Sequence, residues 1–365
     1  MAPELPRLLS EYMTLAQDRL PDAVTAYFLN GAGAETTMRR NRSDLDRVEL
    51  LPRGLCDLRG GHTRLRLCDQ DMASPILVAP MAFQSLLHPD AERGTAAAAT
   101  AQGLGMVLSA QASQPMERVR AAGDGCSWFQ IYWQGSREQT LALAERAAAA
   151  GFGAVTLTID APVSGVRDHE ILTGFQPPQM QDLPNLAGLS QPRFTPLSEG
   201  ESALFDRIAH ILPVWEDVAW FCGASPLPVL IKGILAADDA ERAVMAGAAG
   251  VIVSNHGGRV LDGAVSTISA LPGVVARVDG AVPVLMDGGI RRGVDVFRAL
   301  ALGARAVLVG RPVACGLAVG GAQGASHVLR LLRDELEIAM ALAGCATLDQ
   351  ITPDRVRHRF GASPS

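Results

Sequence analysis

A regular alternation of short apolar runs with alanine-rich amphipathic stretches dominates the chain from residue 75 onward. The apolar runs cover residues 75–82, 105–111, 128–133, 154–160, 228–233, 250–255, 283–289 and 306–311. Stretches with helical periodicity, at 137–150, 236–247, 292–302 and 323–343, lie between or after them. This alternation is typical of βα units whose strands form a parallel sheet. Eight such units predict a (β/α)8 TIM barrel.

The remaining segments are placed around this barrel. Residues 1–74 precede the first unit, and we expect an N-terminal extension of helices and short strands that packs on the barrel. Residues 163–205 follow the fourth strand and are rich in Pro, Gln and Leu, with little periodicity. Because this stretch is too long for an ordinary connection, we expect a flexible active-site loop. We interpret residues 1–365 as a single domain, with the barrel at 75–345.

Composition excludes several classes of function. The chain of 365 residues has a net charge of −6 and no basic cluster, which argues against nucleic-acid binding. Its N-terminus lacks a signal-peptide pattern, and no apolar run is long enough to span a membrane. The six cysteines are scattered without a CxxC pair, which indicates reduced thiols and neither a disulfide framework nor a metal site. We therefore expect a cytoplasmic protein that binds no metal and no membrane.

Polar side chains stand at the ends of nearly all the predicted strands. In a barrel of this kind the active site lies at the C-terminal ends of the strands. A structural sheet would end on turn residues, so the convergence of so many hydrogen-bonding groups predicts a ligand. The groups are Ser109, Gln130, Tyr132, Thr158, Asp160, Lys232, Ser254, His256, Arg259, Asp287, Arg291 and Arg311.

The last two strand ends combine glycine with arginine. "DGGIRRG" follows the seventh strand and "GRP" follows the eighth. Barrels of this type often bind phosphate at this position, through backbone N–H groups and the start of a helix. The alternative is that two glycine-rich turns only close the barrel. The chain has no GxGxxG or Walker sequence that would indicate a Rossmann or P-loop site.

Two other strand ends carry groups suited to catalysis. Lys232 is the single lysine among 32 lysines and arginines, which suggests that its place requires an ammonium. It could act as a Schiff-base nucleophile or as a fixed cation beside an anion, and the alternative is a surface cation. His256, with Asp160 to orient it and Arg259 to grip a carboxylate, could act as a general base. The alternatives are a core histidine and, for Asp160, a helix N-cap.

Several sequence blocks, in order, resemble the FMN-dependent α-hydroxy acid oxidase/dehydrogenase family, which includes glycolate oxidase, lactate oxidase and the mandelate and 4-hydroxymandelate oxidases. The most specific block is "SNHGGR" followed by "LDGA", and others are "LPRGLCDL", "APMAF", "WFQIYW", "LTIDAP" and "LIKGI". The resemblance covers roughly residues 5–345. It implies a homotetramer that uses FMN to oxidise an L-2-hydroxy acid to the 2-oxo acid.

The resemblance also implies roles for individual residues. FMN would lie across the barrel mouth, and Lys232 would stabilise its anionic reduced form. His256, paired with Asp160, would take a proton from the substrate, and Tyr132 would act beside it. The substrate contacts would be Tyr27, Tyr132, Arg167, Arg259 and His256. The FMN contacts would be Pro80, Met81, Ala82, Ser109, Gln130, Thr158, Lys232, Ser254, Asp287, Gly289, Arg291, Gly310 and Arg311.

This chain departs from the family pattern near the expected site. "GVRDHE" has Val166 before Arg167, where the family often has a second arginine. Gln111 stands where a bulky or apolar residue is common, which indicates a more polar substrate pocket, and Phe28 replaces one tyrosine of a common pair.

The electron acceptor is inferred from Ala82 and from what the chain lacks. Ala82, at the position that faces the reactive flavin nitrogen, resembles the oxidases, and no haem domain or membrane-inserting segment is visible. Both features favour O2, with H2O2 as the product. Three alternatives stay open: a dehydrogenase with another acceptor, a flavin barrel of the isopentenyl diphosphate isomerase type, and a non-catalytic flavin-binding module.

Overall fold

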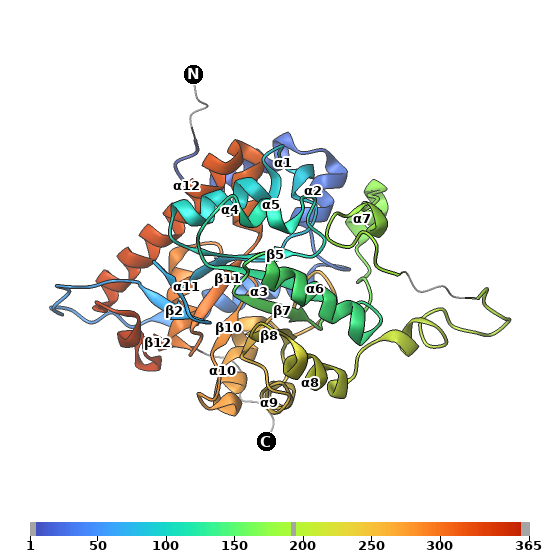
Figure 1. Ribbon diagram of the computed structural model, residues 1–365. Coiled ribbons are helices and arrows are strands. Elements are labelled where there is room, and N and C mark those ends of the chain that lie inside the picture. The colour runs from blue at the N-terminus through green and yellow to red at the C-terminus, as the bar shows by residue number, and fades with distance from the viewer. Residues whose placement is uncertain (1–4, 191–194, 359–365) are drawn as a thin grey trace.

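The computed structural model describes residues 5–190 and 195–358, and its centre is a closed barrel of eight parallel strands (Figure 1). The predicted barrel is therefore confirmed. The strands follow one another around the ring in chain order, and the last pairs with the first. They are β4 (Ile76–Val78), β5 (Gly105–Ser109), β6 (Ser127–Tyr132), β7 (Ala154–Thr158), β8 (Val229–Ile234), β9 (Gly250–Val253), β10 (Val284–Met286) and β11 (Ala306–Val309).

Most of the strands are shorter than the apolar runs that predicted them, while β6 and β8 have the predicted length. β10 ends at Met286, whereas the predicted run continued to Gly289. Gly288 and Gly289 have φ of 91° and 83°, so the chain leaves the ladder there in a turn that only glycine adopts easily. The residues beyond each strand therefore become site loops.

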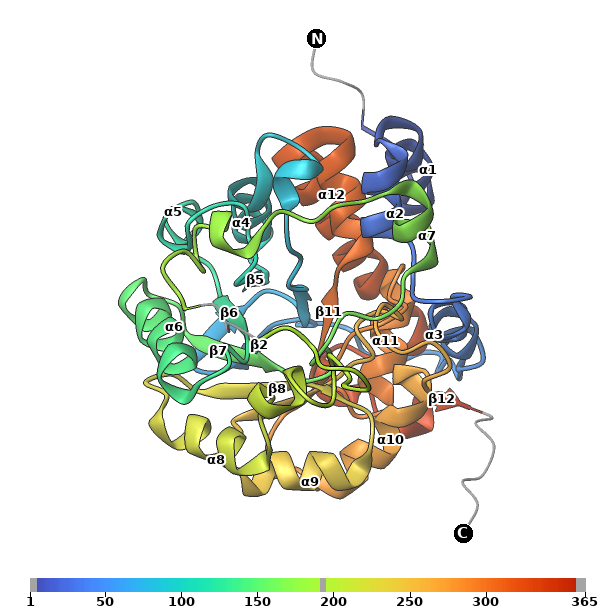
Figure 2. The ribbon, with the colours of Figure 1, turned by 90° about the vertical axis from the view of Figure 1, so that its right-hand side faces the viewer.

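Helices surround the barrel, and Figure 2, which looks into the ring of strands, shows them on its outside. The predicted helix at 323–343 corresponds to the second of two helical pieces that together form α12, which begins at Arg311, and the pieces meet at a kink where Gly320 and Gly321 leave helical geometry. No helix of the described residues has the length and apolarity needed to cross a bilayer. The surrounding helices are α4 (Ala91–Ala101), α5 (Met116–Arg120), α6 (Arg137–Ala149), α8 (Trp215–Ala224), α9 (Ala237–Met245), α10 (Thr267–Val278), α11 (Gly293–Ala301) and α12 (Arg311–Ala343).

The N-terminal extension packs on the barrel as predicted. It contains α1 (Leu9–Arg19), α2 (Asp22–Leu29), α3 (Thr36–Asp46), β1 (Glu49–Leu50), and a hairpin of β2 (Leu65–Leu67) and β3 (Gln70–Met72), and β1 pairs with β12 (Val356–Arg357). Apolar side chains of the hairpin, including Leu65 and Met72, belong to one buried cluster with barrel residues such as Val107 and Trp128. The hairpin therefore closes one end of the barrel and leaves the other for a site.

The segment at 163–205, predicted as a loop, contains a short helix, α7 (Asp168–Thr173), beside α2 on the face turned to the viewer in Figure 2. The Gly33 backbone N–H donates to the Val166 carbonyl at 2.9 Å, which ties this segment to the N-terminal extension. Single-turn 3-10 helices complete the fold: η1 (Gln84–Leu86), η2 (Met180–Asp182), η3 (Ile208–Ile211), η4 (Leu348–Gln350) and η5 (Pro353–Arg355).

Candidate active site

A cavity opens at the C-terminal ends of the barrel strands. Its volume is about 990 Å³, including the solvent-filled space at its mouth. The predicted site residues that line it are Tyr27, Pro80, Met81, Ala82, Ser109, Tyr132, Arg167, Lys232, His256, Arg259, Asp287, Gly289, Arg291, Gly310 and Arg311. Gln111, which was expected at the substrate pocket, also lines the cavity. The residues that were not predicted for the site but line it are Phe28, Ala79, Gly257, Gly288, Ile290 and Leu308. Most of these lie next to a predicted residue and contribute backbone or apolar surface, so their residue type gave no signal.

Four predicted site residues, Gln130, Thr158, Asp160 and Ser254, do not line the cavity and contact or adjoin the residues that do. The Ser109 hydroxyl donates to Gln130 Oε1 at 3.1 Å, and Lys232 Nζ donates to Ser254 Oγ at 2.8 Å. Thr158 stands opposite Lys232 in the register of β7 and β8. These residues therefore form a buried polar layer around the cavity wall.

His256 lies on a sharply turned backbone immediately after β9. Its φ is 56°, in the left-handed region that non-glycine residues rarely adopt, and Gly257 and Gly258 follow at 66° and 76°. A Cβ at Gly258 would lie 2.7 Å from the Met38 backbone, so α3 packs too closely for another residue there. Such backbone strain is typical of functional positions, where the surrounding structure holds it in place. The turn brings the imidazole to the cavity.

The imidazole of His256 is held at both ring nitrogens. Nδ1 lies 2.9 Å from Asp160 Oδ1, and Nε2 lies 3.5 Å from the Tyr132 hydroxyl. A carboxylate at Nδ1 favours the tautomer with the proton on that nitrogen, so Nε2 is the nitrogen that carries the lone pair. The His256 side chain can therefore accept a proton at Nε2.

The charges around this pair keep Asp160 ionised. Burial alone would raise the pKa of Asp160, but the positive charge of Lys232 and the contact with His256 outweigh burial, and the pKa is lowered. For Lys232, burial favours the neutral amine, but Asp287 and Asp160 outweigh it and the pKa is raised. Both groups are thus charged at neutral pH. Burial raises the pKa of Tyr132, which stays a neutral hydrogen-bonding phenol.

Two arginines converge on Tyr27 from different elements. The guanidinium carbons of Arg259 and Arg167 lie 4.8 and 5.9 Å from the centre of the Tyr27 ring. Arg167 Nε donates to the Arg259 carbonyl at 3.1 Å. A carboxylate that sequence analysis did not single out, Glu170 of α7, lies 2.8 Å from Arg167 and 3.4 Å from Arg259. Its spacing from Arg167 is a helical signal only if a helix is expected there, and we expected a loop.

The opposite end of the cavity is rich in positive charge and glycine. Arg291 follows β10, and Arg311 begins α12 after Gly310. Burial lowers the pKa of both arginines, which means that their charges lack sufficient compensation in the protein alone. Arg311 donates to the carbonyls of Gly257 and Asn30 at 2.8 and 2.9 Å. Two partly buried cations beside a helix start form a suitable site for a phosphate.

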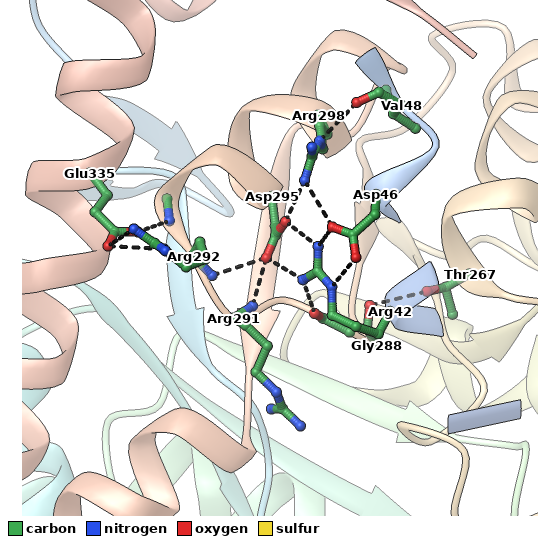
Figure 3. A network of polar contacts seen from close by, with 12 residues as sticks. Arg42, Asp46, Val48, Thr267, Gly288, Arg291, Arg292, Asp295, Arg298 and Glu335 are labelled. Atoms are coloured by element: carbon green, nitrogen blue, oxygen red, sulfur yellow. Dashed lines mark hydrogen bonds and ion pairs between the residues drawn. The ribbon is translucent and has the colours of Figure 1, made fainter. Parts of the chain in front are cut away.

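A buried ion-pair network supports the turn that carries Arg291. Figure 3 shows Asp295 accepting hydrogen bonds from Arg42, Arg298 and the backbone N–H groups of Arg291 and Arg292, while the Arg291 side chain points away from Asp295. Arg42 comes from α3, so the network ties the N-terminal extension to the phosphate end. Burial raises the pKa of Asp295, but its contacts with Arg42 outweigh this and the pKa is lowered.

We expect Asp295→Asn to destabilise the fold by about 3 kcal/mol at neutral pH, because removing one partner leaves buried groups unpaired. The value is at the low end of the usual range because the Arg42 side chain is 31% exposed. A lowered native pKa stabilises the fold above the unfolded pKa of about 4, and this contribution is lost as pH falls through the native pKa. Urea unfolding across pH measures both effects, and the difference between variant and wild type should shrink in acid.

Asp334→Asn is the matched control, since Asp334 forms an exposed ion pair with Arg330 at 2.7 Å on α12. It should change the free energy of unfolding by at most about 1 kcal/mol. Equal effects of the two substitutions would contradict a supporting role for the buried network.

The buried polar atoms of the site that lack a partner fit FMN. Within the described part of the chain they include Gln130 Nε2, Thr158 Oγ1, Asp287 Oδ1 and Arg311 Nε. Buried polar groups are normally paired, so each of these atoms points to a missing partner. The amide and hydroxyl suit the heteroatoms of a flavin ring, the carboxylate suits ribityl hydroxyls, and the arginine suits a phosphate. The residues present therefore match the three parts of the cofactor.

Comparisons with known proteins agree with this donor set. Residues 16–358 match the family described as FMN-dependent dehydrogenase. The chain is 49% identical over 350 residues to an L-lactate oxidase of Roseobacter sp. (strain GAI101), covering 96% of this chain and 94% of the relative. It is 43% identical over 344 residues to glycolate oxidase 1 of Zea mays, covering 94% of this chain and 93% of that relative.

A solved structure has the same fold over nearly the whole chain. A crystal structure of mandelate oxidase with benzoyl-formic acid matches with a TM-score of 0.86 and 39% identity, and the match covers 98% of this chain and 99% of the other. The two proteins therefore share their fold over nearly the whole of both chains.

Proposed function

This chain belongs to the FMN-dependent dehydrogenase family, and we propose that it oxidises an L-2-hydroxy acid to the 2-oxo acid with O2 as the electron acceptor. The observation that carries this proposal is the His256–Asp160 pair, with 2.9 Å between Nδ1 and Oδ1, on the same cavity as two arginines that can bind a carboxylate. A base beside a carboxylate site is what removal of two electrons and two protons from a 2-hydroxy acid requires. The names of relatives and neighbours, which are lactate, glycolate and mandelate oxidases, support the same reaction.

The protein residues supply proton transfer and orientation. Bound FMN supplies the two-electron oxidising chemistry. His256 takes a substrate proton at Nε2, and Asp160 stabilises the resulting imidazolium through Nδ1–H. The Tyr132 hydroxyl, 3.5 Å from Nε2, lies where it can hydrogen-bond to the substrate hydroxyl or carboxylate.

Arg167 and Arg259 hold the substrate carboxylate in this proposal, with Tyr27 beside them. Both arginines line the cavity, and their side chains are 19% and 15% exposed. Charge-assisted hydrogen bonds in such surroundings are strong because water competes poorly. Holding the carboxylate fixes the substrate's α-carbon with respect to His256.

Arg259→Met should weaken binding of a carboxylate inhibitor by at least tenfold, because a hydrogen bond to a charged group contributes about 1.5–3 kcal/mol. Arg259→Lys should recover only part of the affinity, since an ammonium cannot reproduce the two-pronged contact of a guanidinium. Titration calorimetry on the FMN-loaded variants measures both values. Unchanged affinity in both variants would place the carboxylate site elsewhere.

O2 is the proposed acceptor because Ala82 lines the cavity, as in the oxidase pattern, and because the named relatives are oxidases. Electrons from the substrate reduce O2 to H2O2 in the overall reaction. An oxygen electrode together with a peroxide assay tests this step. Flavin reduction by substrate without oxygen consumption would instead favour another acceptor.

A panel of 2-hydroxy acids, from glycolate and lactate to mandelate and 4-hydroxymandelate, determines which side chain the substrate carries. Gln111 lines the cavity and makes it more polar than the common family pattern, which favours a substrate with a hydrogen-bonding side chain. Anaerobic bleaching of the yellow protein identifies the substrate. A yellow protein that no 2-hydroxy acid bleaches would favour the non-catalytic alternative. The cytoplasmic location and the homotetramer stay predictions.

A further inference from the structure

Glu170 lies against the two arginines to which we assign the substrate carboxylate. Arg167 Nη1 donates to both oxygens of Glu170, at 2.8 and 3.0 Å, and Arg259 Nη2 donates to Oε1 at 3.4 Å. The Glu170 side chain is only 16% exposed. The contact is therefore a shielded carboxylate between two guanidinium groups, which is the arrangement that a substrate carboxylate also needs.

The contact with Glu170 occupies a donor of Arg167 that bidentate binding of a substrate carboxylate would need. A guanidinium binds a carboxylate bidentately through one of two edges, Nε with Nη2 or Nη1 with Nη2. In Arg167, Nε donates to the Arg259 carbonyl at 3.1 Å and Nη1 donates to Glu170. Each edge of Arg167 thus has one donor engaged. Without Glu170, the Nη1–Nη2 edge would be free.

Arg259 is engaged in the same way. Its Nη1 donates to the carbonyls of Tyr27 and Asn30, and its Nη2 donates to Glu170. The only edge that avoids the two carbonyls is Nε with Nη2, and Glu170 holds one member of that edge. Release of Glu170 would therefore free one complete binding edge on each arginine.

Glu170 belongs to a short element at the surface of the molecule. Helix α7 has six residues, none of them buried. The segment packs on α2, Phe175 stacks on Tyr27 with ring centres 4.6 Å apart, Gly33 donates a hydrogen bond to Val166, and His169 Nε2 lies 3.9 Å from Glu35 Oε1. The stacking, the hydrogen bond and the His169 contact do not involve the Glu170 side chain, so the carboxylate can leave the arginines while the segment stays attached.

From these contacts we propose that Glu170 is a built-in competitor of the substrate carboxylate, and that substrate binds by displacing it from Arg167 and Arg259. This inference rests on the proposed function, because it assumes that these arginines bind the substrate. It makes Glu170 a residue that sets affinity for anionic ligands without taking part in the chemistry. The affinity of the enzyme is then weaker than its arginines alone would give.

The test measures binding of oxalate to the FMN-loaded protein by titration calorimetry. Oxalate offers the carboxylate of a 2-hydroxy acid but has no α-hydrogen, so it binds without turnover. Glu170→Gln, which removes the charge and keeps the shape, should lower the Kd about five- to tenfold. This is the gain expected if the arginines are free only about one time in five to ten in the wild type. Glu170→Ala should also lower the Kd for oxalate.

Asp168→Asn is the matched control, because Asp168 is exposed on the same helix and loses the same charge. Its Kd for oxalate should stay within about twofold of wild type, since a solvent-exposed charge is screened by water and salt. An unchanged or higher Kd in both Glu170 variants would overturn the proposal, and a higher one would mean that Glu170 orients the arginines. An equal decrease of the Kd in Asp168→Asn would also overturn the proposal.

The same titration separates this inference from the proposed function. If Arg259→Met abolishes oxalate binding but the Glu170 variants do not tighten it, the carboxylate site stands and only the competitor is wrong. If no 2-hydroxy acid reduces the flavin, the proposed function fails on its own measurement. In catalysis, a displaced competitor predicts that KM falls in Glu170→Gln by about the same factor as the oxalate Kd.

Discussion

Substitution of His256 by alanine is expected to lower the rate of substrate oxidation by roughly 10²- to 10⁴-fold, which is the usual contribution of a positioned general base. Asp160, 2.9 Å from Nδ1, holds the ring so that Nε2 is available, and no other described side chain on the cavity combines a free lone pair with such a partner. FMN should stay bound, because its proposed contacts are made by other residues. Anaerobic stopped-flow measurement of flavin reduction isolates the affected step from reoxidation.

A second histidine provides the control for this experiment. His210 is exposed in η3, outside the cavity, so His210→Ala should reduce its flavin at the wild-type rate. The flavin spectrum and the melting temperature of both variants show whether cofactor and fold are intact. A His256→Ala protein that reduces its flavin nearly as fast as wild type would eliminate His256 as the base and return it to the role of a structural histidine.

The barrel could be predicted because its signal is repeated and local. Each strand is an apolar run bounded by turn residues, and several runs end where a polar residue or glycine meets the cavity, as at Asp287 after β10. The start of α12 could not be predicted, because Gly320 and Gly321 divide it and the periodicity is visible only after them. In the sequence, a glycine pair at such a kink predicts the end of a helix.

The site was predictable to the extent that residue type reveals chemistry. His256, Lys232 and Arg259 could be predicted because ionisable side chains at the ends of buried strands indicate a functional site. Glu170 does not, because its role depends on α7, a helix of six residues within a segment of weak periodicity. Contacts between segments far apart in sequence, such as that of Glu170 with Arg259, depend on packing that no local pattern encodes.

Lys232 is the second residue for which we expect a large effect. Its Nζ lies 3.1 Å from Asp287 and 4.0 Å from Asp160, and the side chain is 3% exposed. Lys232→Met would leave these two carboxylates without their cation, and breaking a buried ion pair on one side typically costs about 3–5 kcal/mol of stability. Stability alone does not distinguish a structural counter-ion from a flavin contact, because both roles predict this loss.

The flavin midpoint potential makes that distinction. If the Lys232 ammonium lies against the flavin ring, it favours the reduced cofactor, and its removal should lower the potential by about 30–60 mV, which for two electrons corresponds to about 1.5–3 kcal/mol. Asp295→Asn is the control, since it also breaks a buried ion pair but lies behind the phosphate end, so at saturating FMN its potential should equal that of wild type.

Lys232→Arg is the sharper variant, because arginine serves as the cation everywhere else in this chain. A guanidinium is broader than an ammonium and spreads its charge over a plane. In a site that is 3% exposed and bounded by Ser254 and Asp287, it has no room to keep the same position. The variant should fold, hold FMN less tightly and show a lowered potential. An unshifted potential in Lys232→Met would mean that Lys232 does not contact the flavin, and the proposed position of FMN across the barrel mouth would then be wrong.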